Sequence, residues 1–566
     1  MPQYVSSLMA QLPEPRLRKM MKNFLHNIFF PLSALAYFTL AVQRAYEIEV
    51  CTVSVVLAVF MMSMVATQVP DLWQPTRQLP WSLQSYAFLA AAGVCWFYFT
   101  DCTNFFTLRP DFAEILRALS ASVDMTRVFG MGMSLAAFPF LAVVFSFLLS
   151  SVRRLLTESG IFRTFNRAEW LLYALLTIVL LAYAAWAFSL SNGFYSANNG
   201  GYDIVYTADT DALYNNMAYL SLTFVENDLR QPLFALFSAP FAGVPYVISH
   251  LLGLTPALTA ILFNSVQVLL LMAGHLMLTA LVGRTPFRRF AFLLLLCASY
   301  TTLLNAVMVE QYITAYFWLM LTVVAICQGT SSTRLPFLGA SGSLLTSAAI
   351  APWCSCHSLR RTPRRWLWDM CKLTFSGIGL LVAFGRFDVL YSVAEKIASL
   401  SKFTGSDLSF SSRFAQYSSF LHDCFLAPAA GIAQGSAPDG ILSWRLDVVS
   451  GLHPMGMALM LLFILSAWLH RRQRLCQVAF YWSIFSCVLL AVIGWGTWEV
   501  GLILYSLYFC WCFLLLLFRL LERLAEKLHA AWLVPVASLL GALIMLSQNV
   551  PGMQALIDYC VTFFPL

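Results

Sequence analysis

The chain has 566 residues, of which 60% are apolar and only 11% are charged. An average soluble protein carries about 25% charged residues, so this composition excludes a water-soluble globule. It equally excludes a collagen, a disordered tail and a nucleic-acid-binding domain. The net charge of +7 is spread over short loops between apolar blocks, which indicates membrane topology and not a surface for nucleic-acid phosphates. The sequence therefore predicts an all-α, polytopic transmembrane protein with the lipid bilayer as its partner and no nucleic-acid partner.

The apolar blocks are about 20 residues long, the length at which a rise of about 1.5 Å per residue crosses about 30 Å of hydrocarbon. There are about thirteen such blocks. The predicted spans, in chain order, are Phe24–Val42, Val50–Gln68, Ser82–Thr100, Phe129–Ser150, Glu169–Leu190, Ala257–Leu281, Phe290–Val307, Tyr312–Gln328, Leu367–Phe384, Leu452–Leu469, Cys476–Trp495, Val500–Phe518 and Trp532–Gln548.

Two further apolar segments, Pro232–Gly253 and Leu335–Trp353, contain several Pro and Gly residues. Such interruptions are tolerated at membrane depth only where the backbone is buried in protein or lines a cavity. If either segment crossed alone, the arginine clusters after it would lie on the wrong face. We expect the first to be an external surface or re-entrant helix and the second to be a short cytoplasmic hairpin.

The distribution of charge predicts the orientation of the chain in a plasma (cytoplasmic) membrane. With the N-terminus in the cytoplasm, the arginine clusters fall on the cytoplasmic side and most carboxylates on the other, as the positive-inside rule requires. The C-terminus is then external, and so are two long loops, residues 191–256 and 385–451. These two loops are where we expect function to reside.

The first external loop contains two carboxylates, Asp209 and Asp211, and Asp228 follows them. Paired carboxylates suit a divalent cation such as Mg²⁺ or Mn²⁺, or a general base with a metal beside it. The alternative is a solvated acidic loop, because two Asp residues separated by one position occur in many proteins without any such role.

Glu310 lies between two apolar stretches and is followed by Gln311 and Tyr312. A charge at membrane depth costs about 2.5–3.5 kcal/mol unless it has a partner, so we expect a carboxylate here to be paired or to have a function. Glu499 is in the same position between two later spans. A functional cavity on the external face would explain both residues, and so would a polar turn that caps a helix.

Arg230 lies between Asp228 and Pro232. Its guanidinium could neutralise Asp228 in a structural pair, or could bind the phosphate of a lipid head group with its planar fork. Arg386 and Arg413 in the second long loop are alternatives for the same task. The sequence contains no Walker loop, no Rossmann glycines, no G-x-S-x-G and no H-E-x-x-H, so ATP-driven transport and common hydrolase chemistry find no support.

Taken together, this organisation resembles the GT-C superfamily of lipid-phosphate-sugar glycosyltransferases, and its protein mannosyltransferases in particular. In that superfamily a long first external loop carries a catalytic acid, a Pro-Pro-Leu or His-Pro-Leu motif precedes the second core helix, and a second acid lies in the next external turn. In this chain Asp209 or Asp211 corresponds to the first acid of the family pattern. Arg230-Gln-Pro-Leu233 corresponds to its motif, and Glu310 corresponds to its second acid. The Asp-Thr-Asp pattern departs from the more usual Asp-Glu pair.

The resemblance implies an inverting transferase of the cell envelope that moves a hexose or pentose from a polyprenyl phosphate to a glycan, lipid or protein acceptor. It implies an N-terminal four-helix addition in residues 1–168, a GT-C-like core in 169–550 and an external tail in 551–566. It assigns catalysis to Asp209, Asp211 and Glu310, with the two Asp residues as metal ligands. The substrate-binding residues it implies are Asp228, Arg230, Gln311, Tyr312 and Glu499.

Two other functions remain open at this stage. A transporter or flippase for a lipid-linked or polar solute would place paired charges near the membrane midplane. A surface polysaccharide ligase or polymerase would share the lipid-phosphate donor and would carry a basic external loop, which this chain has only in part.

Overall fold

The computed structural model describes residues 29, 31–37, 79–100, 125–195 and most of 204–566. Within the last range the longer gaps are 222–228, 356–361, 435–441 and 497–501. The described residues are predominantly helical, as the sequence predicts, and they divide into two compact units. The first unit comprises residues 1–155, 218–253 and 372–393, and the second comprises 156–217, 254–371 and 394–566.

Seven helices in the described part of the chain are long and apolar enough to cross a membrane, or up to eight if one bent pair counts as a single span. About thirteen spans were expected, and that number is not reached here. Part of the difference has a simple origin, because Val50–Gln68 and most of Phe24–Val42 lie outside the described residues. Three further apolar helices are shorter: Tyr312–Gln328, Leu345–Cys354 and Pro454–Leu469.

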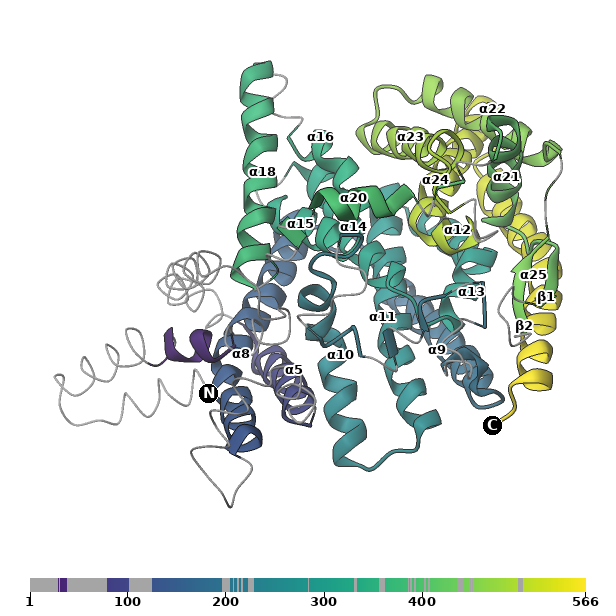
Figure 1. Cartoon of the computed structure of the whole chain (residues 1–566). Helices are drawn as coiled ribbons and strands as arrows, with labels where there is room; N and C mark the ends of the chain where they lie inside the picture. Colours follow the sequence, from purple (N-terminus) through teal and green to yellow (C-terminus); the bar gives the residue numbers. More distant parts are fainter. Residues whose placement is uncertain are drawn as a thin grey trace. The chain divides into compact units, whose positions relative to one another are not determined.

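The first unit is built around α5 (Trp81–Thr100), α8 (Met125–Ser159) up to residue 155, α10 (Phe234–Leu251) and the end of α18 (Pro363–Ala383). Helices α5 and α10 pack side by side (Figure 1). They cross where Gly93 faces Gly243, and a Cβ on either residue would collide with the other helix's backbone. Small residues allow this close approach, as they do at many helix contacts in membranes.

Helix α10 corrects one expectation about Pro232–Gly253. Its Pro and Gly residues were expected to interrupt the segment, but the helix runs unbroken from Phe234 to Leu251 with Pro240 and Pro245 inside it. Its length and composition are those of a possible span. Tolerance of the two prolines follows from packing, because most of its residues are buried against the rest of the unit.

The second unit contains α9 (Arg167–Phe188), α11 (Pro256–Val282), α12 (Pro286–Ala298), α13 (Tyr300–Val307) and α14 (Tyr312–Gln328). An Asn166–Glu169 capping box starts α9. The Glu169 carboxylate also accepts two hydrogen bonds from Arg289 of α12, at 2.6 and 2.8 Å. This pair is almost fully buried and joins the two helices at their N-terminal ends.

The expected span Phe290–Val307 is broken at Ser299 into α12 and α13, which bend by 59°. The loosened backbone is satisfied by other segments: the N–H of Tyr300 donates to the Phe425 carbonyl, and Asn549 donates to the carbonyls of Ala298 and Phe425. A broken helix inside an apolar region requires such partners. These hydrogen bonds fix the start of α13, the helix that leads to the turn before α14.

The second unit also contains the following helices, in chain order: α15 (Arg334–Ser343), η4 (Leu345–Ile350), α16 (Ala351–Cys354), α20 (Val393–Leu400), α21 (Phe410–Asp423), α22 (Pro454–Leu469), α23 (Arg474–Cys487), the π-helix η6 (Val488–Val492), η7 (Leu502–Tyr505), α24 (Ser506–Lys527) and α25 (Leu533–Phe563). The segment expected as a cytoplasmic hairpin, Leu335–Trp353, forms the short broken series α15, η4 and α16.

A two-stranded antiparallel sheet, β1 (Ala430–Gln434) and β2 (Leu442–Leu446), lies beside α25 (Figure 1). The loop after α9 joins its edge, because the N–H of Trp444 donates to the Ile204 carbonyl and the N–H of Tyr206 donates to the Trp444 carbonyl. Ser191, at the start of this loop, is hydrogen-bonded to the carbonyl of Cys560 near the end of α25. Hydrogen bonds therefore fix the first long loop at Ser191 and again at Ile204 and Tyr206.

Candidate functional site

The loop that carries Asp209 is fixed on its N-terminal side by Tyr206. This residue adopts a left-handed backbone conformation, with φ of 50°. Its hydroxyl accepts a hydrogen bond from the Trp444 indole N–H at 3.1 Å and shares one with the Tyr300 hydroxyl at 2.9 Å. Burial raises the pKa of Tyr206 to about 12, so its phenol stays neutral and serves as an anchor.

Asp209 meets Glu310 at this point. The backbone N–H of Asp209 donates to Glu310 Oε1 at 3.0 Å, and the backbone N–H of Gln311 donates to Glu310 Oε2 at 2.9 Å. The Gln311 side chain in turn donates to Asp209 Oδ2 at 3.2 Å. Residues from two distant segments therefore form one hydrogen-bonded cluster.

The two carboxylates differ in exposure. Glu310 is 1% exposed and lies just before α14, where the positive end of the helix dipole favours a negative charge. Asp209 is half-buried. Since both Glu310 oxygens accept backbone N–H groups, the geometry suits Glu310 for holding the loop and leaves Asp209 as the carboxylate with access to a ligand.

Several buried polar atoms in Gln311 and on the helices next to it have no hydrogen-bond partner within the described residues. Gln311 Oε1 is one of them, in the residue that contacts Asp209. The others on the adjoining helices α11, α13 and α14 are Asn264 Oδ1, Gln267 Oε1, Asn305 Oδ1 and Thr314 Oγ1. Unsatisfied buried acceptors are uncommon in native proteins, and a ligand or water that donates hydrogen bonds would satisfy them.

Tyr312 lies next to the cluster and packs edge-on against Tyr505, with ring centroids 5.4 Å apart. Tyr505 in turn contacts Gly496, which has a left-handed φ of 75° and no room for a side chain. Gly496 therefore lies beside Tyr505, the ring that packs against Tyr312. Glu499 itself lies outside the described residues.

The other expected site residues have different placements. Asp211 and Asp228 lie outside the described residues. Arg230 is half-buried in the turn before α10 and belongs to the first unit. Arg413 donates to the carbonyl of Ile493 at 3.2 Å, which gives it a structural role on α21.

The expected divalent cation finds little support in the donor set described here. No group of three His, Cys, Asp or Glu side chains is arranged around a common centre in the part of the chain that is described. The oxygens of Glu310 already accept backbone N–H groups, and Asp209 Oδ2 already accepts from Gln311, so a metal would share these oxygens with hydrogen-bond donors. No step of the reaction considered below passes through a metal ion.

A second cluster, which the sequence did not single out, lies at the end of α21 in the same unit. Asp423 accepts hydrogen bonds from His422 Nδ1 at 2.9 Å and Ser419 at 3.3 Å, and it lines a pocket with about 470 Å³ of empty space. Burial raises the pKa of Asp423 above its ordinary range, against the opposing effect of His422. The consecutive His and Asp at a helix end were the only available sequence signal.

His453 belongs to this cluster as well. Its ring lies 4.5 Å from that of His422, and burial lowers its pKa. Its Nδ1 accepts from the N–H of Gly456, so it caps the start of α22. This supports a structural role for His453.

Comparison with known proteins provides no relative: no family model, no curated protein and no solved structure matches this chain. The class that the fold defines is a helical protein with several apolar helices suited to a multi-pass membrane location.

Proposed function

We propose that this protein is a membrane glycosyltransferase that moves a sugar from a polyprenyl phosphate to an acceptor hydroxyl on the non-cytoplasmic face. The single observation that carries the proposal is the cluster of Asp209, Glu310 and Gln311. The resemblance to GT-C enzymes requires an acid from the first external loop and an acid from a later external turn to serve one site. The hydrogen bond from Asp209 to Glu310 joins those two segments.

In the proposed reaction Asp209 is the general base. It removes the proton from the acceptor hydroxyl as that oxygen attacks the anomeric carbon of the sugar. A new C–O bond forms, the bond from the anomeric carbon to the phosphate oxygen breaks, and the phosphate leaves with the electron pair. Because attack and departure occur on opposite faces, the configuration inverts. A positioned base of this kind typically contributes about 10²–10⁴ in rate.

Glu310 and Gln311 have positioning roles in this proposal. Glu310 holds the backbone of Asp209, and the Gln311 amide orients the Asp209 carboxylate. Gln311 Oε1 has no partner among the residues that the structure describes, and in this proposal it accepts a hydrogen bond from a substrate hydroxyl. The assignment of base chemistry to Asp209 alone refines the sequence-based prediction, which gave Glu310 a catalytic role.

The remaining sequence-based predictions belong to the same proposal. They are about thirteen spans, a plasma-membrane location with the N-terminus in the cytoplasm and the C-terminus outside, and functional regions with boundaries at residues 168 and 550. The two compact units are defined by contacts between residues, and they do not test the functional boundaries at residues 168 and 550. Those boundaries remain a prediction. The catalytic and metal-binding roles of Asp211, and the roles of Asp228, Arg230, Tyr312 and Glu499 in binding substrate, also remain predictions.

The donor class can be tested with the purified protein in lipid vesicles. A radiolabelled hexose on polyprenyl phosphate is offered in one arm and the same hexose on a nucleoside diphosphate in the other, and cleavage of each donor is followed by thin-layer chromatography. We expect cleavage of the polyprenyl-linked sugar alone, by transfer or by slow hydrolysis. Movement of the intact donor across the vesicle membrane without cleavage would contradict the proposal and favour a flippase.

A further inference from the structure

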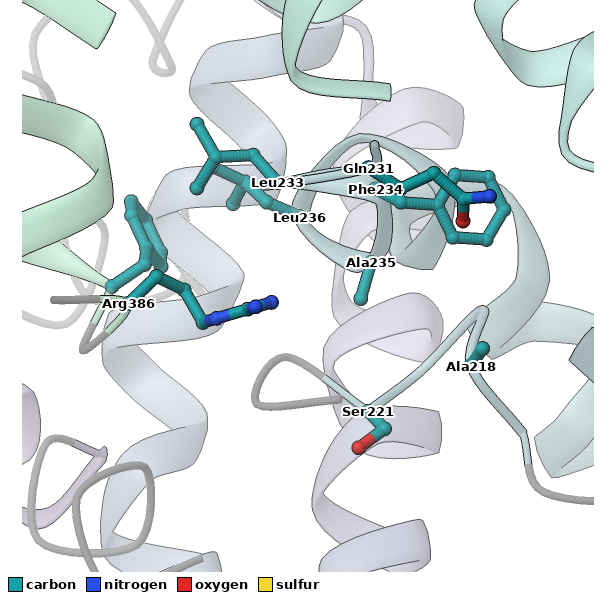
Figure 2. A pocket seen from close by; sticks show the side chains of 9 residues that line it. Ala218, Ser221, Gln231, Leu233, Phe234, Ala235, Leu236 and Arg386 are labelled. Carbon is teal, nitrogen blue, oxygen red and sulfur yellow. The ribbon is translucent and has the colours of Figure 1, made fainter. Parts of the chain in front are cut away.

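A pocket in the first unit, at the start of α10, is too small to bind a ligand (Figure 2). Its cavity volume is about 10 Å³, and a single water needs about 10–15 Å³. Figure 2 shows that its polar side chains, those of Ser221, Gln231 and Arg386, point apart. They do not form one binding site.

The pocket that Asp423 lines, in the second unit, is larger, with a cavity volume of about 70 Å³. It has room for several waters or for a small polar group. One face of α21 contributes Gln416, Ser419 and Asp423, because residues three or four positions apart lie on the same side of a helix. Asp447, which follows β2 directly, also lines the pocket. Two distant segments therefore contribute carboxylates to one cavity.

The charge of this pocket is negative. Among the described lining residues the ionisable side chains are those of Asp423 and Asp447, and no Lys, Arg or His is present in that set. Asp447 is exposed, so a ligand can reach it from the solvent. The lining therefore favours a cation over an anion.

Asp423 is 5% exposed, although it lines the pocket. A buried carboxylate is stable when hydrogen-bond donors or a cation replace the water it has lost. Its donors are His422 Nδ1 and the Ser419 hydroxyl, and burial still raises its pKa, so these donors do not replace that water completely. Each carboxylate oxygen has two lone pairs, which leaves room for a further donor.

We infer that this pocket binds the primary ammonium group of a small organic cation. An ammonium group has three N–H donors and a positive charge, which match the carboxylates of Asp423 and Asp447. The apolar lining, which includes Phe420, Leu446 and Leu502, can pack against the carbon atoms next to the nitrogen.

A divalent metal fits this pocket less well. No group of three His, Cys, Asp or Glu side chains in the described ranges is arranged to hold a metal ion. The ammonium group can belong to a free amine or to a lipid head group. This inference goes beyond the proposed function and does not depend on it.

The test is saturation-transfer NMR, which detects weak ligands, on the purified full-length protein in phosphatidylcholine nanodiscs. The probe is ethylamine, and ethanol is its neutral counterpart of nearly the same size. Binding curves are measured for the wild type, Asp423→Asn and Asp447→Asn. The matched control is Asp558→Asn, which changes an exposed carboxylate on α25 outside the pocket. A second set of nanodiscs contains phosphatidylethanolamine, whose head group carries a primary ammonium.

We expect ethylamine to bind at least about tenfold more tightly than ethanol, because hydrogen bonds between charged groups are the stronger ones. Asp423→Asn should weaken ethylamine binding at least about tenfold, and Asp447→Asn about two- to fivefold, because exposed ion pairs contribute less. Asp558→Asn should leave binding unchanged. Weaker ethylamine binding in the phosphatidylethanolamine nanodiscs identifies the lipid head group as the source, and unchanged binding identifies a free amine. Both results support the inference.

The absence of saturable ethylamine binding, or binding that both pocket variants retain at wild-type strength, would overturn the inference. Ethanol binding as tight as that of ethylamine would also overturn it, because the site would then accept neutral hydroxyl groups. Misfolding does not obscure these outcomes, since Asp447 is exposed and Asn has nearly the same size. Transfer activity is not part of this test, so its result is independent of the proposed function.

Discussion

The backbone N–H of Asp209 donates a 3.0 Å hydrogen bond to the carboxylate of Glu310, although the two residues are 101 positions apart. This contact joins the long loop after α9 to the start of α14. A loop held by a buried carboxylate can keep its own half-buried carboxylate in one position, which is what a general base requires.

The contact predicts different effects for two conservative variants. Glu310→Gln presents an amide N–H₂ toward one of two backbone N–H donors, so we expect it to lower the free energy of unfolding by about 1–3 kcal/mol. Asp209→Asn keeps an acceptor for Gln311 and should change stability by less than about 0.5 kcal/mol. Thermal unfolding in detergent distinguishes them. Equal stability of the two variants would contradict the positioning role of Glu310.

The buried pair of Glu169 and Arg289 should matter more to stability than any exposed pair. Arg289→Met leaves the Glu169 carboxylate buried without its main partner, and breaking such a pair costs about 3–5 kcal/mol. Arg523→Gln is the control, because Arg523 and Glu526 are about half exposed, and such pairs contribute about 0–1 kcal/mol. Both losses are measured from thermal unfolding. Similar losses for the two variants would disprove this account of the α9–α12 contact.

The crossing of α5 and α10 should tolerate no added side chain. Gly243→Ala places a methyl group against the backbone of Ala90, and we expect it to lower stability by about 1–3 kcal/mol. Gly132→Ala in α8 is the matched control, because nothing lies within 4 Å of its added Cβ. The control should be neutral or stabilising by up to about 1 kcal/mol. An unchanged melting temperature for Gly243→Ala would show that the helices do not cross there.

Asp423 predicts a pH dependence of stability. Burial raises its pKa, so the folded protein holds this proton more tightly than the unfolded chain. The protonated Asp423 side chain therefore contributes fully to the free energy of unfolding below the ordinary pKa of 3.8. This contribution is lost as the pH rises through the raised pKa of the folded protein. Asp423→Asn cannot ionise, so its melting temperature relative to the wild type should increase between about pH 4 and pH 7. A difference that is constant with pH would contradict this reading.

Charge patterning was enough to predict that Asp209 and Glu310 share a face, because each follows an apolar block of span length and the arginines lie at the opposite ends. Their hydrogen bond adds a geometry that no pattern could supply. The break at Ser299 was not predicted, since the short polar run Ser299–Thr302 within Phe290–Val307 is compatible with one continuous span and the partners that satisfy the break, Phe425 and Asn549, are distant in sequence.

The unbroken course of α10 was missed for a similar reason. Proline removes one backbone donor, and sequence alone cannot show whether the surrounding packing compensates for Pro240 and Pro245.

The most direct test of the central claim is the rate of sugar transfer from polyprenyl phosphate by the purified protein, compared between the wild type and Asp209→Asn. We predict a loss of about 10²-fold or more with unchanged thermal stability, since the base is removed and the fold is kept. Asp558→Asn, which changes an exposed carboxylate on α25, should retain the wild-type rate. Full transfer by Asp209→Asn would contradict the assignment of Asp209 as the base.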